Sequence, residues 1–194
     1  MDGRSRRRRF MTLLIATIAT LSLAFESSRS PAMSDATLPR SVILPLNAIS
    51  RFFPDISRET STGRNLMATG NPKATRMVIY ETDDGSKKVT ITIDQYENLR
   101  DASSAYHQAV QKSQSVPGYK PVQTPRLGQR TFAGTVTMDA ETHIGLGALD
   151  HELILGTTLA GYDFTGGNAD KLLAIARMQG LLAKRSVSST ERRW

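Results

Sequence analysis

The segment from residue 76 to 94 constrains the fold of this chain most strongly. Its first half, RMVIYE, is rich in β-branched and aromatic residues, and its second half, KKVTITID, alternates polar and apolar residues. The dipeptide Asp84-Gly85 lies between the two halves, and it is a strong hairpin signal in that position. The apolar residues of the second half are Val89, Ile91 and Ile93. We therefore predict an antiparallel hairpin with one buried face and one solvated face.

Helix and strand patterns continue after this hairpin. Apolar residues recur at spacings of three and four in residues 95–114, which predicts an amphipathic helix. Residues 119–127 contain prolines and predict an edge strand, and residues 165–184 predict a second helix. Three further strands are expected at 129–138, 142–149 and 152–164. The order β-β-α-β-β-β-β-α predicts an α+β domain, with an antiparallel sheet of about six strands and two main helices.

Two segments flank the predicted domain, which we place at residues 76–184. We expect residues 35–75 to form an irregular extension, because residues 55–75 are rich in Ser, Thr, Gly and Asn and show no sustained period. One short helix is expected within it, beginning near Pro45 and ending before Pro54. Residues 185–194 are expected to form a disordered basic tail.

The element order and the spacing pattern of small and aromatic residues resemble those of small exported domains with the PsbP-like fold. This fold is named after an extrinsic photosystem subunit. The resemblance covers about residues 76–182, and it implies an accessory, sensor or binding module without carrying over any site residue. A cystatin-like or NTF2-like domain, in which a curved sheet wraps one long helix, is the alternative architecture. The residues of this spacing pattern are Tyr96, Ala105-Tyr106, Ala109, Pro117-Gly118-Tyr119, Leu127-Gly128 and Phe132-Ala133-Gly134.

The first 34 residues have the order of an export signal. A basic stretch at 4–9 precedes a 16-residue apolar stretch at 10–25, and small residues suited to cleavage follow before Asp35. A membrane-spanning helix needs about 20 apolar residues, so a cleaved signal is favoured over a retained anchor. In either case residues 35–194 are expected outside the cytoplasm, in the periplasm or secreted, after Sec or twin-arginine export. Without any cysteine, the chain can form neither disulfides nor a lipid-modified N-terminal cysteine.

The net charge of +7 belongs to the two ends of the chain. Residues 1–34 hold six Arg against two acidic residues, and residues 184–194 hold four basic residues against one. Residues 35–183 therefore contain 15 basic and 15 acidic side chains. A nucleic-acid-binding domain carries excess positive charge on its folded surface, so we expect no nucleic-acid partner.

Two groups of residues are candidates for a site. Aromatic residues could line a ligand groove between the sheet and a helix; they are Tyr96, Tyr106, Tyr119, Phe132 and Tyr162. The segment DAETHIGLGALDHE contains residue types that bind divalent metals, and the candidate ligands are His143, His151, Glu141 and Asp150. If a tight turn falls at 150–151, however, the two histidines lie at opposite ends of one strand, roughly 26 Å apart.

No sequence motif indicates a particular reaction, and no catalytic residue or cofactor is predicted. We expect a non-enzymatic exported domain that binds an unidentified protein or small molecule. The alternative is a metal-dependent hydrolase centred on His143 and His151, and a tight turn at 150–151 would remove its site.

Overall fold

A computed structural model describes residues 36–138 and 141–191. Their centre is one antiparallel sheet with the strand order β1-β2-β3-β7-β6-β5-β4. The strands are β1 Arg58–Gly63, β2 Ala74–Glu81, β3 Lys88–Gln95, β4 Lys120–Pro121, β5 Arg130–Met138, β6 Glu141–Asp150 and β7 Leu153–Ala160. The helices are the 3-10 turn η2 Arg40–Val42, α2 Leu46–Ile49, α3 Leu99–Gln114 and α4 Gly166–Glu191.

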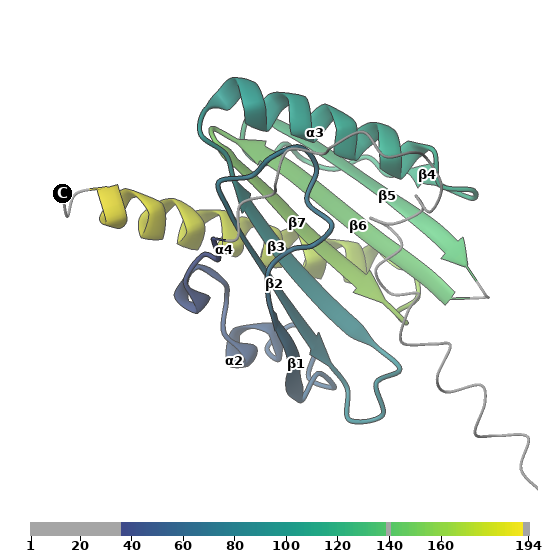
Figure 1. The fold of residues 1–194 in the computed structure, drawn as a ribbon. Helices are drawn as coiled ribbons and strands as arrows, with labels where there is room; N and C mark the ends of the chain where they lie inside the picture. The colour runs from purple at the N-terminus through teal and green to yellow at the C-terminus, as the bar shows by residue number, and fades with distance from the viewer. Residues whose placement is uncertain (1–35, 139–140, 192–194) are drawn as a thin grey trace, which may run out of the picture.

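The helices cover both faces of the sheet (Figure 1). Helix α3 lies across one face, which we call the α3 face. Helix α4 and the N-terminal segment with η2 and α2 cover the other face, which we call the α4 face. The α+β class and the antiparallel sheet predicted from the sequence are therefore confirmed.

The predicted hairpin is present as β2 and β3. The two strands pair along their whole lengths, from Ala74 opposite Gln95 to Glu81 opposite Lys88. Gly85 in the turn has a φ of 69°, which an L side chain rarely adopts. Helix α3 is the first of the two predicted main helices. It begins after Asn98, whose side chain accepts a hydrogen bond from the Asp101 backbone amide. The edge position of β4 is also as predicted, although the strand has only two residues.

The sheet has seven strands rather than six, because β1 lies in the extension that we expected to be irregular. Five of its six residues are exposed, and its sequence RETSTG has no apolar alternation. The strand forms by pairing with β2 at the edge of the sheet, where it buries almost no side chain. A strand without a buried face leaves no period in the sequence.

Helix α4 is longer than predicted. It begins at Gly166 and continues to Glu191, so the expected disordered tail is wrong for residues 185–191, while residues 192–194 lie outside the described residues. No Gly or Pro interrupts 185–191, and Ser186 Oγ donates to the Leu182 carbonyl one turn earlier. The chain can therefore continue the helix without a break.

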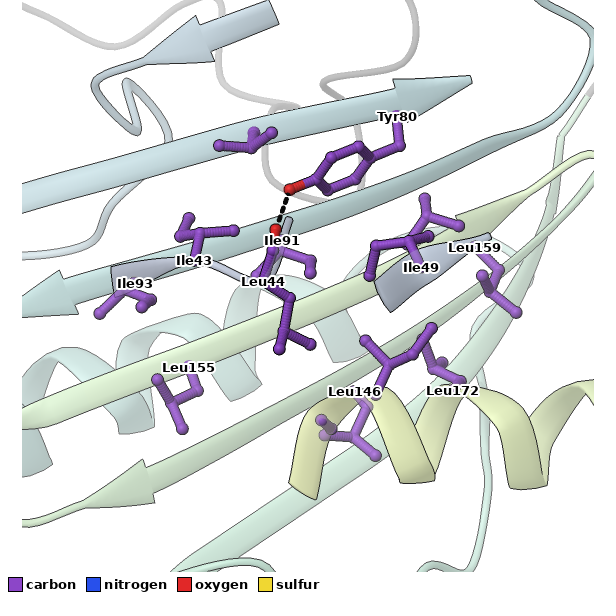
Figure 2. Packing of buried hydrophobic residues seen from close by; sticks show 14 of the residues in the cluster. Ile43, Leu44, Ile49, Tyr80, Ile91, Ile93, Leu146, Leu155, Leu159 and Leu172 are labelled. Atoms are coloured by element: carbon purple, nitrogen blue, oxygen red, sulfur yellow. Dashed lines mark hydrogen bonds between the residues drawn. The ribbon is translucent and has the colours of Figure 1, made fainter. Parts of the chain in front are cut away.

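The main hydrophobic core lies on the α4 face. The three alternating residues Val89, Ile91 and Ile93 are each no more than 1% exposed, which confirms that they share a buried face. Figure 2 shows how three layers meet here, from the sheet, the N-terminal segment and α4. The labelled residues are Tyr80, Ile91, Ile93, Leu146, Leu155 and Leu159 of the sheet, Ile43, Leu44 and Ile49 of the N-terminal segment, and Leu172 of α4.

Polar contacts fix the N-terminal segment inside this core. The Tyr80 hydroxyl donates to the Leu44 carbonyl (Figure 2). The side chain of Gln179 on α4 is fully buried; its Nε2 donates to the Val42 carbonyl at 2.7 Å, and its Oε1 accepts from the Leu44 amide at 3.0 Å. One side chain thus satisfies two buried backbone groups of a segment that lies outside the sheet.

Candidate functional site

Four glycines lie on neighbouring strands in the middle of the α3 face. Gly147 of β6 pairs with Gly156 of β7, and Gly145 of β6 pairs with Gly134 of β5. Directly paired residues point to the same side of a sheet, so no side chain rises from these positions. A Cβ on Gly147 would lie 2.2 Å from the Phe132 ring, and one on Gly156 would lie 2.4 Å from Thr92 Oγ1. Neighbouring side chains lean over the glycines, and larger residues do not fit there.

Helix α3 and the loop between β1 and β2 cover this region of the sheet, and a cavity of about 180 Å³ lies between them and the strands. The helix contributes Ala109, Lys112 and Ser113, and the loop contributes Asn65, Met67, Ala68 and Thr69. The floor includes Thr90 and Thr92 of β3, Ile154 and Thr158 of β7, His143 of β6 and Phe132 of β5.

Hydrogen bonds hold the loop against the helix. Thr69 Oγ1 donates to the Ala105 carbonyl, and the Tyr96 hydroxyl donates to the Thr69 carbonyl, both at 2.7 Å. Thr90 and Thr92 belong to the face of the hairpin that we predicted to be solvated. They are half-buried, because α3 and the loop cover that face of the hairpin and leave a cavity beneath them.

Asp94 is the buried carboxylate of this cavity. It is 5% exposed, and both of its oxygens accept from one nitrogen, Asn65 Nδ2, at 2.9 and 3.0 Å. Burial raises the pKa of the Asp94 carboxyl to about 7, and the hydrogen bond from Asn65 opposes this rise. Asn65 is also buried, and its backbone amide donates to Thr75 Oγ1 at 3.0 Å. The Asp94–Asn65 pair therefore anchors the cavity loop to the sheet.

His143 lies at the other end of the cavity. Asp94 is opposite Ile154 on β7 and His143 is opposite Ala160, so they lie six positions apart along β7, which is roughly 20 Å. His143 is 6% exposed. Burial lowers the pKa of its imidazole, although the nearby Glu141 acts in the opposite direction. The imidazole is therefore neutral at neutral pH, and it can accept or donate a hydrogen bond but cannot share a substrate atom with Asp94.

Of the five aromatic residues predicted to line a groove, Phe132 alone borders this cavity. Tyr96 and Tyr106 are buried in the contact between α3 and the sheet, where the Tyr106 and Phe132 rings meet edge to face at 5.6 Å. Tyr119 lies against Gly134, and its hydroxyl donates to the Ala133 carbonyl at 3.1 Å. Tyr162 belongs to the core of the α4 face and donates to Asp55 at 2.8 Å. The predicted set therefore does not form one groove.

The four candidate metal ligands do not come together either. Strand β6 extends from Glu141 to Asp150, and His151 lies in the tight turn that follows, with a φ of 55°. His143 lines the cavity, whereas His151 is exposed and Asp150 pairs with Lys184 of α4 at 2.7 Å. Among residues 36–138 and 141–191, no three His, Asp or Glu side chains gather into a possible metal site.

Of the polar residues that line the cavity, His143 had been named as a candidate metal ligand, whereas Asp94 and Asn65 were not predicted. Asp94 is the last residue of the alternating pattern, and a carboxylate there is also typical of a solvated strand end. Asn65 lies in a segment without periodicity, 29 positions from its partner. The one signal in the sequence was the set of glycines in three consecutive strands, since glycine inside a strand often marks a close approach of another group.

Comparison with known proteins identifies a fold but no family. No family model matches the sequence, and no curated protein matches it. Among solved structures, the chain is similar to the extracellular domain of PknH from Mycobacterium tuberculosis, with a TM-score of 0.55 and 11% identity. The match covers 72% of this chain and 93% of that domain. At this identity the likeness concerns the fold alone, and the PsbP-like resemblance stays a prediction.

The predicted export signal, residues 1–34, lies outside the described residues. Within the part of the chain that the structure describes, no helix combines the length and hydrophobicity needed to cross a membrane.

Proposed function

We propose that this chain is an exported, non-enzymatic domain that binds a small, largely apolar molecule in the cavity on the α3 face. The cavity itself carries the proposal. Its volume, about 180 Å³, exceeds the roughly 150 Å³ of an engineered apolar cavity that binds benzene. Pockets of this kind combine an apolar lining with a few polar groups that orient the ligand. Here Phe132 and Ile154 provide apolar surface, and Asp94 and His143 provide the polar groups.

The separation of the two titratable groups supports binding rather than catalysis. A general acid and a general base must both reach the reacting atoms, within about 3 Å or through one water. Asp94 and His143 are roughly 20 Å apart along β7. The tight turn at His151 likewise separates the histidines of the alternative metal-dependent hydrolase. No observation therefore favours that alternative.

Two further observations support the proposed export and the proposed class of ligand. The similar PknH domain is extracellular, which agrees with export through the predicted signal at residues 1–34. The balanced charge of residues 35–183 favours a small molecule or a protein over a nucleic acid.

Filling the cavity from α3 should abolish binding of a neutral apolar probe. Ala109 is half-buried on α3 and lines the cavity, so the Ala109→Phe ring would occupy the space of the ligand. We expect the fluorescence of N-phenylnaphthylamine to rise on binding to the wild type, and its Kd to increase at least about tenfold in Ala109→Phe, a loss of about 1.4 kcal/mol. A fluorescence titration measures both constants.

The matched control is Gln108→Phe, which adds the same ring to an exposed position of the same helix. This variant should bind the dye as the wild type does. Equal dye binding by the wild type and Ala109→Phe, or no binding by the wild type, would contradict the proposed function.

A further inference from the structure

Resting on the proposed function, we propose that the ligand of this cavity carries a cationic nitrogen that lies against Asp94. The ligand would thus be an amine or a related base with an apolar body. The inference comes from the surroundings of this one carboxylate and from the shape of the cavity beside it.

Asp94 is a buried acid without a cation. It lines the cavity and is 5% exposed, yet among the described residues no lysine, arginine or histidine forms an ion pair with it. The carboxylates of Asp55, Glu59 and Asp150, in contrast, each pair with a basic side chain. Buried charges in proteins are ordinarily paired. We therefore expect a ligand in the cavity to supply the cationic partner.

The hydrogen bonds that Asp94 does receive leave room for such a partner. Its two oxygens share a single donor, the Asn65 amide nitrogen, although an ionised carboxylate can accept about four hydrogen bonds. A protonated amine supplies both the missing charge and further donors, and charge-assisted hydrogen bonds are about twice as strong as neutral ones. A neutral or anionic head group would supply no compensating charge.

Among the described residues, Lys112 and His143 are the other titratable side chains that border the cavity, and Tyr96 interacts electrostatically with Asp94. Tyr96 follows β3 but donates its hydroxyl to the Thr69 carbonyl. Lys112, in the last turn of α3, is exposed, and His143 lies roughly 20 Å away along β7. None of them compensates Asp94, and the floor between Asp94 and His143 consists largely of Gly, Thr and apolar residues. An elongated ligand body fits this surface, with its basic group at the Asp94 end.

Three probes with the same body test the inference: phenylbutylamine, phenylbutanol and phenylbutyrate. Their Kd values are measured by displacement of N-phenylnaphthylamine at about pH 8, where the Asp94 carboxyl is ionised. We expect the amine to bind the wild type most tightly. The Asp94→Asn variant keeps an acceptor for Asn65 but loses the charge, so the Kd of the amine should rise at least about tenfold while that of the alcohol changes less than about twofold.

Glu97→Gln is the matched control, because it removes one negative charge at an exposed position just after β3. It should leave all three Kd values unchanged. Tighter binding of the alcohol or the acid than of the amine by the wild type would overturn the inference even if Asp94→Asn fails to fold. Binding of none of the probes, the dye included, would instead overturn the proposed function.

Discussion

Between about pH 4 and about pH 7, the free energy of unfolding of the wild type should fall by roughly 3 kcal/mol relative to that of Asp94→Asn. The cause is the Asp94 carboxyl, whose pKa rises from 3.8 in the unfolded chain to about 7 on burial. In this pH window the unfolded chain releases the proton while the folded chain retains it. The folded state therefore binds more protons, and its stability falls as pH rises. Above the folded pKa the difference becomes constant.

Urea unfolding of both proteins at a series of pH values measures this effect. Taking the difference between them removes the contribution of His143, whose lowered pKa acts with the opposite sign. The Glu97→Gln variant, changed at an exposed position, is the control for a general effect of removing one carboxylate. A wild type that keeps a constant difference from Asp94→Asn across the window would show that Asp94 is not held in a desolvated site.

The Gln179→Met variant should lose about 3 kcal/mol of unfolding free energy. Methionine has a similar length and shape, so the core stays filled, but it cannot replace the two hydrogen bonds. The Val42 carbonyl and the Leu44 amide would then lack their buried partner from α4. Each unsatisfied buried group costs about 1–3 kcal/mol. Chemical denaturation, monitored by circular dichroism, gives the difference.

Gln111→Met is the matched control for this change, since Gln111 is exposed on α3. It should change stability by no more than about 0.5 kcal/mol. A similarly small effect of Gln179→Met would mean that the N-terminal segment is not fixed to α4 as described.

The sequence predicted the elements that alternate or bury one face. The β2–β3 hairpin has both a turn signal and a period of two, and α3 has apolar residues at helical spacing. Strand β1 has neither, because its partner β2 provides the hydrogen bonds and its side chains remain exposed. The continuation of α4 to Glu191 was missed for a related reason, since 185–191 has few apolar residues, although no residue there breaks a helix.

The candidate site was less predictable than the fold. Polar residues such as Thr90 and Thr92 have the same pattern whether they face water or a roofed cavity. The roof comes from α3 and from the loop around Asn65, and their placement over the sheet depends on contacts between distant segments. The aromatic residues were assigned to the groove by type, yet Tyr162 packs on the opposite face. Residue type alone does not specify a face.

Methyl NMR of the chain during addition of phenylbutylamine tests the central claim most directly. We expect chemical shift changes at the methyl groups of Ile154 and Thr158, which line the cavity. Val89 and Leu159, in the core of the α4 face, should change little. Changes confined to exposed apolar residues such as Leu181, or no changes at all, would contradict the conclusion that the cavity on the α3 face is the ligand site.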